Sequence, residues 1–162
     1  MAKKEEKTNV MRVLEQKQIP YTAHAYPADG PTDGVSVATY LQQDVEQVFK
    51  TLVTKAASGA YYVFDIPVAE NLDLKKAAKA VGEKSIAMIP QKELLPLTGY
   101  VHGGCSPVGM KKQFHTVFHE TVILFDTICV SAGKIGAQVE LRSDDLIGLL
   151  EADVADVVVE ER

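Results

Sequence analysis

The sequence predicts an α+β fold in which helices surround a mixed, curved or barrel-like β-sheet. Helical patterns alternate with apolar, β-branched segments, and the hairpin turn Ser58-Gly59 separates two of these segments. At 162 residues the chain has the length of one domain, enough to bury about two thirds of its unfolded surface. We therefore expect a single domain over residues 1–162, without an internal repeat or a linker.

Helices are expected where apolar residues recur at helical spacing behind a capping side chain, and strands where β-branched and aromatic residues run between turns. Thr8 caps the first helix, in which Val10, Val13 and Leu14 share one face, and Pro20 lies just beyond its end. The next expected elements are a strand over residues 21–26, short helices over 36–41 and 44–48 capped by Ser36 and Asp44, strands over 50–56 and 61–68, and a helix from its cap Asp73 to Val81, ended by Gly82.

The second half of the chain begins with a short buried strand over residues 86–89 and a helical turn over 91–95. Three apolar, β-branched segments follow, over 116–118, 121–125 and 127–131, and this composition is typical of strands. Gly133 and Gly136 bracket a tight turn into residues 138–141. Ser143 is expected to cap the final helix, through Leu150, and residues 154–159 to close the fold as a last strand.

The bulk properties narrow the class of protein. A net charge of −5 argues against a chain that coats nucleic acid by itself, and we expect no DNA binding, but a local basic patch can still contact one end of an RNA. No run of about 18 apolar residues is present, so no membrane span is expected. Residues 1–7 alternate lysine and glutamate, lack the apolar core of a signal peptide and are expected to fray. With only two cysteines, a disulfide framework is not expected and a cytoplasmic location fits best.

The most informative stretch is residues 99–112, called the glycine loop below, which contains four glycines, Ser106-Pro107 and, at its end, Lys111-Lys112. Gly103 and Gly104 let the backbone come close to a ligand and turn N–H groups outward. Pro107 biases Ser106 toward an extended conformation, which stiffens the loop. The composition suits a rigid cradle for an anionic or carbonyl-bearing ligand, and it equally suits a surface connection rich in turn residues.

No recognisable nucleophile or metal motif accompanies this loop. Cys105 and Ser106 lie outside a Gly-x-Ser-x-Gly motif, without an evident His-Asp pair. His115 and His119 share a face in either regular structure but lack a third ligand at matching spacing, so no metal is predicted. Neither Gly-x-x-x-x-Gly-Lys-[Ser/Thr] nor Gly-x-Gly-x-x-Gly occurs, so we expect no nucleotide cofactor. These features favour a reaction that needs little chemistry from the protein.

Four motifs occur in a specific order along the chain. They are Lys50-Thr51, Leu72-Asp73-Leu74-Lys75-Lys76, the Gly-Gly-x-Ser-Pro-x-Gly run over 103–109 and the Ser-x-Gly-Lys-x-Gly run over 131–136. From about Asn9 to Val158 the chain resembles the YbaK/EbsC family of free-standing aminoacyl-tRNA deacylases, which are related to the editing domain inserted in bacterial prolyl-tRNA synthetases. The resemblance implies an enzyme that removes cysteine from mischarged tRNA(Pro), without a cofactor.

The resemblance also implies a mechanism. The aminoacyl ester is already activated, and the thiol of the substrate's own side chain would attack it while the protein positions the ester and stabilises the oxyanion. Lys50 matches the family's functional lysine, and backbone N–H groups near Gly103 and Gly104 would be the oxyanion donors. On composition alone, a strand-end lysine in solvent is the favoured interpretation of Lys50, and the match to the family reverses it. Tyr26 is equally well explained as a half-buried strand aromatic.

The resemblance assigns the remaining site residues. Tyr26 matches a tyrosine that lines the family's pocket, and the motifs supply further substrate contacts. The implied substrate-binding residues are Tyr26, Thr51, Ser106, Pro107, Ser131, Gly133 and Lys134. Lys50 and Lys134 join Lys111 and Lys112 in a small basic rim for the acceptor end of tRNA.

Two positions depart from the family pattern, and two other functions compete with the leading one. Ala132 stands where a second glycine is common, and Gln138 replaces an acidic residue, which puts the amino-acid preference in doubt. The competing functions are deacylation of Ala-tRNA(Pro) or another small aminoacyl-tRNA, and a non-catalytic module that binds nucleotide or RNA. Because the net charge is −5, we expect weak tRNA affinity alone and a helper, prolyl-tRNA synthetase.

Overall fold

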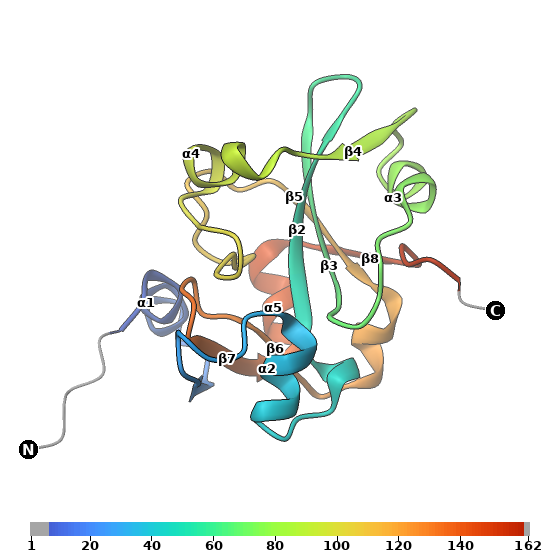
Figure 1. The fold of residues 1–162 in the computed structure, drawn as a ribbon. Coiled ribbons are helices and arrows are strands. Elements are labelled where there is room, and N and C mark those ends of the chain that lie inside the picture. Colours follow the sequence, from blue (N-terminus) through green and yellow to red (C-terminus); the bar gives the residue numbers. More distant parts are fainter. Residues whose placement is uncertain (1–6, 161–162) are drawn as a thin grey trace, which may run out of the picture.

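A computed structural model describes residues 7–160 and confirms the α+β class (Figure 1). The fraying expected for residues 1–7 falls outside this range except at Lys7, whose ammonium pairs with Glu15. The helices are α1 (Asn9–Gln16), α2 (Gly34–Tyr40), α3 (Leu74–Ala80), α4 (Leu94–Thr98) and α5 (Ser143–Leu150), with 3₁₀ turns at Val45–Gln47, Gln91–Glu93 and Glu120–Leu124. The strands are β1 (Tyr21–Ala25), β2 (Phe49–Ala56), β3 (Tyr61–Pro67), β4 (Ile86–Met88), β5 (His115–His119), β6 (Thr127–Ser131), β7 (Ala137–Arg142) and β8 (Asp153–Ala155).

The strands divide into two sheets. The small sheet has the order β1-β7-β6 and is antiparallel, whereas the large sheet has the order β4-β2-β3-β5-β8. The large sheet is mixed, as expected, because β5 runs parallel to both β3 and β8. A parallel bridge between Val48 and Cys129 joins the two sheets immediately before β2. Figure 1 shows the long β2–β3 hairpin rising above the small sheet, which lies beside α1 and α2.

The main core lies between the two sheets. Phe49 of β2 and Phe118 of β5 are buried there with ring centroids 6.2 Å apart, and they pack with Val130 and Val139 of the small sheet. Helices α1 and α5 cover the same cluster. Because this core fixes Phe49, it also fixes the start of β2, where Lys50 and Thr51 follow.

Several caps expected from the sequence are confirmed. The Thr8 hydroxyl accepts a hydrogen bond from the Met11 N–H at the start of α1, and the Asp73 carboxylate accepts from two N–H groups at the start of α3. Asp44 likewise caps the turn Val45–Gln47, but this segment is a single 3₁₀ turn and not the helix expected over 44–48. These three elements therefore begin where their capping side chains indicate.

The cap of α2 was wrongly predicted. The carboxylate of Asp33 accepts from the Ser36 N–H, so the helix begins two residues earlier than expected, at Gly34. The Ser36 hydroxyl donates to the same carboxylate and caps nothing. A Cβ at Gly34 would lie 2.4 Å from a methyl carbon of Val68, so glycine allows α2 to start directly against the end of the β2–β3 hairpin.

The second half of the chain departs more from expectation. Residues 121–125 are β-branched but lie mainly in a 3₁₀ turn, with Ile123 and Leu124 each 71% exposed. The Ser143 hydroxyl donates to the Phe125 carbonyl and caps no helix. Only β8 and a bridge between Leu72 and Val158 form in the C-terminal segment expected as one strand. Strand β4 has one buried residue, Ile86, because it is an edge strand. No helix in residues 7–160 is long and apolar enough to cross a membrane.

Candidate functional site

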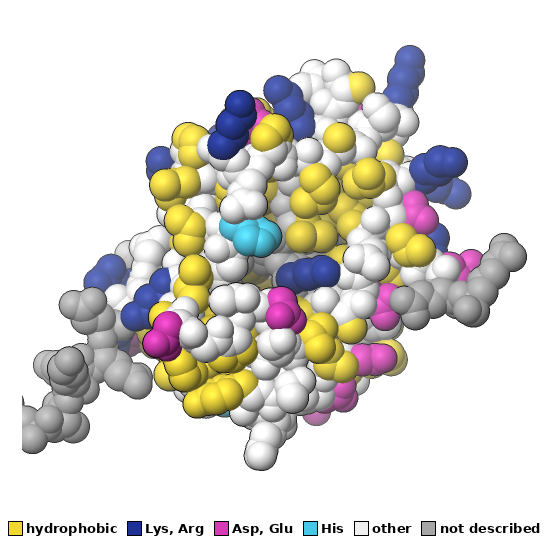
Figure 2. Space-filling model, viewed as in Figure 1, with side chains coloured by type: hydrophobic (Ala, Val, Ile, Leu, Met, Phe, Trp, Pro, Cys, Tyr) yellow, Lys and Arg dark blue, Asp and Glu magenta, His cyan; other side chains and the backbone are white. Residues whose placement is uncertain are grey.

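A pocket of about 310 Å³ lies where the two sheets meet. Its walls come from the first half of β2, the glycine loop, the adjoining ends of β6 and β7, and the start of α2. Figure 2 shows a face of the molecule that is hollowed near its middle, where a histidine and a basic side chain lie beside one another. The lining residues used below are Tyr26, Asp33, Lys50, Thr51, His102, Gly103, Cys105, Ser131 and Gln138.

The pocket exists because the first half of β2 is an uncovered strand edge. Strand β4 pairs only with residues 54–56 of β2, and the Ile89 N–H adds one bond to the Val53 carbonyl. Within the described chain, no strand pairs with the remaining edge of β2, and the glycine loop faces it across the pocket. The sheet therefore presents backbone and side chains of Lys50 and Thr51 to a ligand.

Lys50 is a half-buried lysine whose ammonium has no ion-pair partner among residues 7–160. Burial lowers the pKa of Lys50, and the negative charge of Glu70 offsets part of this effect. An ammonium that is partly desolvated interacts more strongly with a developing negative charge than one in water. Lys50 can therefore act on a carbonyl oxygen or a phosphate in the pocket.

The glycine loop is held in place by its own hydrogen bonds. The buried Tyr100 hydroxyl donates to the Val108 carbonyl at 2.5 Å, and the Lys111 N–H donates to the Thr98 carbonyl. The Gly104 N–H donates to the Val101 carbonyl at 3.0 Å, so it is not available to an oxyanion in this conformation. The Gly103 N–H makes no hydrogen bond with the described residues, and Gly103 has a φ of +88° that favours glycine. Gly103 therefore carries a backbone N–H at the pocket that remains free to donate to a ligand.

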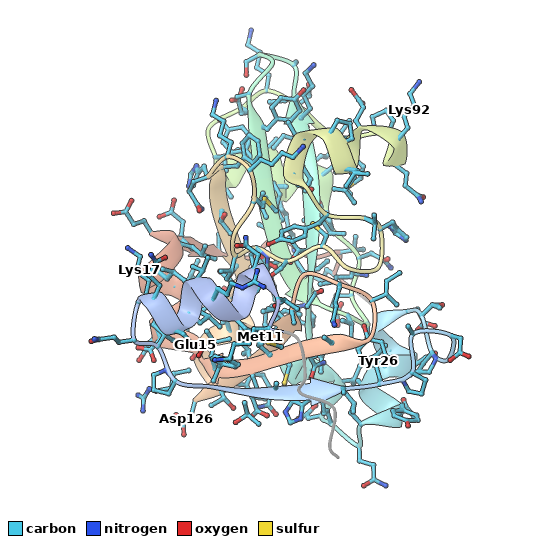
Figure 3. All side chains as sticks on the ribbon, turned by 90° about the vertical axis from the view of Figure 1, so that its left-hand side faces the viewer. Met11, Glu15, Lys17, Tyr26, Lys92 and Asp126 are labelled. Atoms are coloured by element: carbon cyan, nitrogen blue, oxygen red, sulfur yellow. The ribbon has the colours of Figure 1, made fainter. Side chains whose placement is uncertain are left out.

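The structure brings together five of the residues predicted to be catalytic or substrate-binding, and these are Tyr26, Lys50, Thr51, Gly103 and Ser131. Figure 3 shows Tyr26 where the chain leaves β1 toward α2. The other substrate-binding candidates do not line the pocket. Ser106 and Pro107 are buried within the glycine loop, and Gly133 and Lys134 lie in the turn after β6. Lys111 and Lys112 are exposed, and the Lys111 ammonium donates to the Pro96 carbonyl at 3.4 Å.

Ala132, one of the two departures from the family pattern, leaves the turn after β6 intact. It is fully buried in the main core and does not have a positive φ, so alanine fits where a second glycine is common. Gln138, the other departure, lines the pocket, and its amide exchanges hydrogen bonds with that of Gln43. The wall at Gln138 is therefore polar but neutral.

Sequence reasoning missed the contribution of α2 to the pocket. Asp33 supplies the pocket's carboxylate, and hydrogen bonds from Ser36 lower the pKa of Asp33. His102, which carries no motif signal in the sequence, lines the pocket from the glycine loop. The signal that was available was Asp33-Gly34, an N-cap pair at the start of a helix.

The histidines considered for a metal lie in separate environments. His115 pairs with Asp153, and His119 accepts a hydrogen bond from the Val157 N–H. A different group, His24, Cys129 and Glu140, places three ligand atoms within 4.8 Å of one another. His24 and Glu140 form a hydrogen bond at 2.8 Å, and the second oxygen of Glu140 accepts from Thr127. Burial raises the pKa of the Cys129 thiol to about 12. These contacts account for the three side chains without an ion.

Replacing Gly104 should lower the stability of the fold through packing, which is a different effect from losing an oxyanion donor. A Cβ at Gly104 would lie 3.0 Å from backbone atoms of Lys134 and Ile135, so the glycine loop packs directly on the turn after β6. We expect Gly104→Ala to destabilise the fold by about 1–3 kcal/mol and to reduce activity, because the two pocket walls must separate. Chemical denaturation measures the first effect. An unchanged midpoint would contradict this packing role.

The comparisons with known proteins agree with one another. A family model described as an aminoacyl-tRNA editing domain matches residues 32–149. A protein of Enterococcus faecalis, named as a candidate Cys-tRNA(Pro)/Cys-tRNA(Cys) deacylase, EbsC, is 42% identical over 164 residues, which cover 99% of this chain and 100% of the relative.

Two solved structures share the fold at lower sequence identity. A crystal structure described as a candidate trans-editing enzyme for prolyl-tRNA synthetase superposes with a TM-score of 0.83 at 24% identity, covering 94% of this chain and 96% of the other. A crystal structure of a hypothetical protein superposes with a TM-score of 0.85 at 20% identity, covering 93% and 99%. At these identities the likeness shows the fold.

Proposed function

The chain belongs to the aminoacyl-tRNA editing domain family, and on this premise we propose that it is a deacylase that removes cysteine from mischarged tRNA(Pro). One observation carries the proposal: the half-buried ammonium of Lys50, which has no ion-pair partner among residues 7–160, faces a pocket that the glycine loop closes from the other side. An aminoacyl ester offers such a site a carbonyl oxygen for the ammonium and for a backbone N–H.

The protein's own candidate nucleophiles are poorly suited to attack the ester. Burial raises the pKa of Cys105 to about 12, so the side chain stays a thiol at neutral pH, and the thiolate is the reactive form. Ser106 is fully buried, and its hydroxyl accepts a hydrogen bond from the Val108 N–H. These states support a reaction in which the nucleophile belongs to the substrate.

In the proposed reaction the cysteine side chain of the substrate attacks its own ester. The sulfur forms a bond to the carbonyl carbon, and the bond from that carbon to the ribose oxygen breaks. The proton lost by the thiol ends on the ribose oxygen, which leaves with the tRNA, and water then opens the cyclic thiolactone. Well-oriented intramolecular reactions reach effective molarities of about 10⁵–10⁸ M, so positioning by the pocket supplies most of the acceleration.

We assign the stabilisation of the oxyanion and the recognition of the amino group to residues that line the pocket. Lys50 stabilises the negative charge that develops on the carbonyl oxygen, with the Gly103 N–H as a second donor. Asp33 faces the α-ammonium of the amino acid as the carboxylate of the lining. The neutral Gln138 does not add a second charge there.

The charges on the protein surface suggest how the tRNA end approaches the pocket and why a second protein is needed. The acceptor end approaches past the exposed Lys111, Lys112 and Lys134, and Lys50 lies inside. A net charge of −5 gives the rest of the surface little attraction for RNA, so we expect prolyl-tRNA synthetase or an equivalent helper to deliver the substrate. Such a reaction belongs in the cytoplasm, where aminoacyl-tRNA is used.

Substrate-assisted attack predicts that neither protein nucleophile is needed. We expect Cys105→Ala and Ser106→Ala to keep deacylation of Cys-tRNA(Pro) within about tenfold of the unmodified protein, equivalent to about 1.4 kcal/mol of barrier. Ser106→Ala will also lower stability modestly, because its hydroxyl is buried and hydrogen-bonded. Mass spectrometry should detect the thiolactone as a transient product. A covalent acyl adduct on either side chain would refute the mechanism.

A further inference from the structure

Asp65 is a fully buried carboxyl group on β3, directly opposite Thr51 of β2. Its Oδ1 lies 2.6 Å from the Thr51 hydroxyl oxygen, whereas its Oδ2 is buried without a hydrogen-bond partner among residues 7–160. A charged carboxylate in such a place would lack most of the hydrogen bonds that it has in water. Thr51 lines the pocket, so Asp65 is one side chain removed from a bound substrate.

The surroundings of Asp65 favour the neutral acid. Burial raises its pKa to about 8, and the hydrogen bond with Thr51 acts in the opposite direction. Thr51 and Phe118 are the strand partners of Asp65 and share its face of the sheet. Lys50 and His119 are their neighbours along β2 and β5, so strand alternation directs the side chains of Lys50 and His119 to the face opposite Asp65. The titratable group of the glycine loop that faces Asp65 is Cys105. Burial is the main cause that raises the pKa of Cys105, and the charge of Asp65 is a smaller one.

The protonation state of Asp65 controls what Thr51 can offer to the pocket. An ionised carboxylate only accepts, so Thr51 must give it the hydroxyl hydrogen and turn lone pairs toward the ligand. A neutral Asp65 can instead place its proton on Oδ1, which has a partner, and donate to the Thr51 oxygen. The hydroxyl hydrogen of Thr51 is then free to point into the pocket.

We propose that Asp65 is a positioning residue whose proton decides whether Thr51 presents a hydrogen or lone pairs to the substrate. The inference rests on the proposed deacylase function, since it is the ester carbonyl oxygen that needs a donor. With Asp65 neutral, Thr51 adds a hydrogen-bond donor to the pocket from the face of β2 opposite to that of Lys50. With Asp65 ionised, Thr51 becomes an acceptor, and deacylation slows.

The first test compares Asp65→Asn with the unmodified protein on Cys-tRNA(Pro) from pH 6 to 9.5. The asparagine amide is neutral at every pH and can donate to the Thr51 oxygen as the acid does. Below pH 7.5 we expect kcat/KM of the two proteins to agree within about threefold. Above about pH 8 the ratio of unmodified protein to variant should fall about tenfold per pH unit, because one proton is lost. Titration of the substrate affects both proteins alike and cancels in the ratio, and the spontaneous hydrolysis measured without enzyme is subtracted from each rate.

Variants on β2 identify the path of the effect. Thr51→Ser should keep both the rate and the pH dependence, whereas Thr51→Val should lose rate at every pH and show no break near pH 8. Thr54→Val is the matched control, because its buried hydroxyl donates to the Tyr62 carbonyl in the same hairpin and does not line the pocket. A ratio that is flat across the pH range, or a folded Asp65→Asn that is inactive at all pH values, would overturn the inference.

A second test needs no substrate and separates this inference from the proposed function. The unfolded chain releases the Asp65 proton near pH 3.9, whereas the folded protein holds it until about pH 8. Between these values the folded state binds more protons, so Asp65 lowers stability as pH rises, and this effect is complete above pH 8. The melting temperature of Asp65→Asn minus that of the unmodified protein should therefore rise from pH 5 to pH 8 and then level off.

The two tests fail in different ways. If the unmodified protein deacylates nothing but the stability difference rises as described, the proposed function is wrong and the neutral Asp65 stands. In that case Thr51→Val should extend the rise to higher pH, because it removes the hydrogen bond that favours the charged form. A stability difference that does not change with pH would show that Asp65 holds no proton, and it would overturn the inference whatever the activity.

Discussion

Lys50→Ala is expected to abolish deacylation while the protein stays folded. The ammonium is the group in the pocket that can neutralise charge on the ester carbonyl, and losing one such interaction costs on the order of 10²–10³-fold in rate. The cost in stability should be small or favourable, because the lysine is half-buried without an ion-pair partner among the described residues. Single-turnover deacylation and a melting curve on the same preparation measure both effects.

Two further variants make the Lys50 test specific. Lys50→Arg should also fail, because a planar guanidinium does not fit the space of a compact ammonium. Lys55→Ala is the matched control, since Lys55 is an exposed lysine on the same strand, its ammonium 5.4 Å from the centre of the Tyr61 ring and outside the pocket. A folded Lys50→Ala that retains near-normal turnover would remove Lys50 from the mechanism.

Phe118→Ala is expected to give a large loss of stability. Phe118 is fully buried, packs on Phe49 and lies in the core between the two sheets. Truncation of a buried phenylalanine costs about 3–5 kcal/mol, through lost burial and the cavity that remains. Because a domain of this size is stabilised by about 5–15 kcal/mol in total, such a loss threatens folding at physiological temperature.

Chemical denaturation checks this prediction against a control in the neighbouring turn. Leu124→Ala removes an apolar side chain that is 71% exposed, so its cost should stay within about 0.5 kcal/mol. Equal costs for the two variants would show that the core between the sheets does not hold them together.

Local signals predicted most elements of this fold. Thr8, Asp44 and Asp73 cap where expected, and the Ser58-Gly59 turn joins β2 and β3. The division into two sheets was not predictable, because it depends on the pairing of β7 with β1, which is distant in the sequence. Residues 121–125 misled for a related reason: β-branched composition favours a strand only where a neighbouring strand can pair with it.

The site was predicted in part. Lys50, Thr51, Gly103 and Ser131 carry motif signals and meet in the pocket. The expected role of Gly104 as a donor changed, because its N–H bonds to Val101 within the loop. Asp65 carried no signal, since an acidic residue in an apolar strand acquires its meaning only when tertiary burial removes its solvent and leaves Thr51 as its partner.

The proposed editing function is tested most directly by deacylation of purified Cys-tRNA(Pro) and Ala-tRNA(Pro), side by side, at catalytic enzyme concentrations. Substrate-assisted attack predicts that the cysteinyl ester is cleaved on the order of 10²-fold faster or more, because alanine has no thiol to act as an intramolecular nucleophile. Equal cleavage of both esters would make the protein a general deacylase of small aminoacyl-tRNAs. Failure to cleave either ester, by a folded protein that still binds the tRNA, would contradict the enzymatic function and leave a binding module.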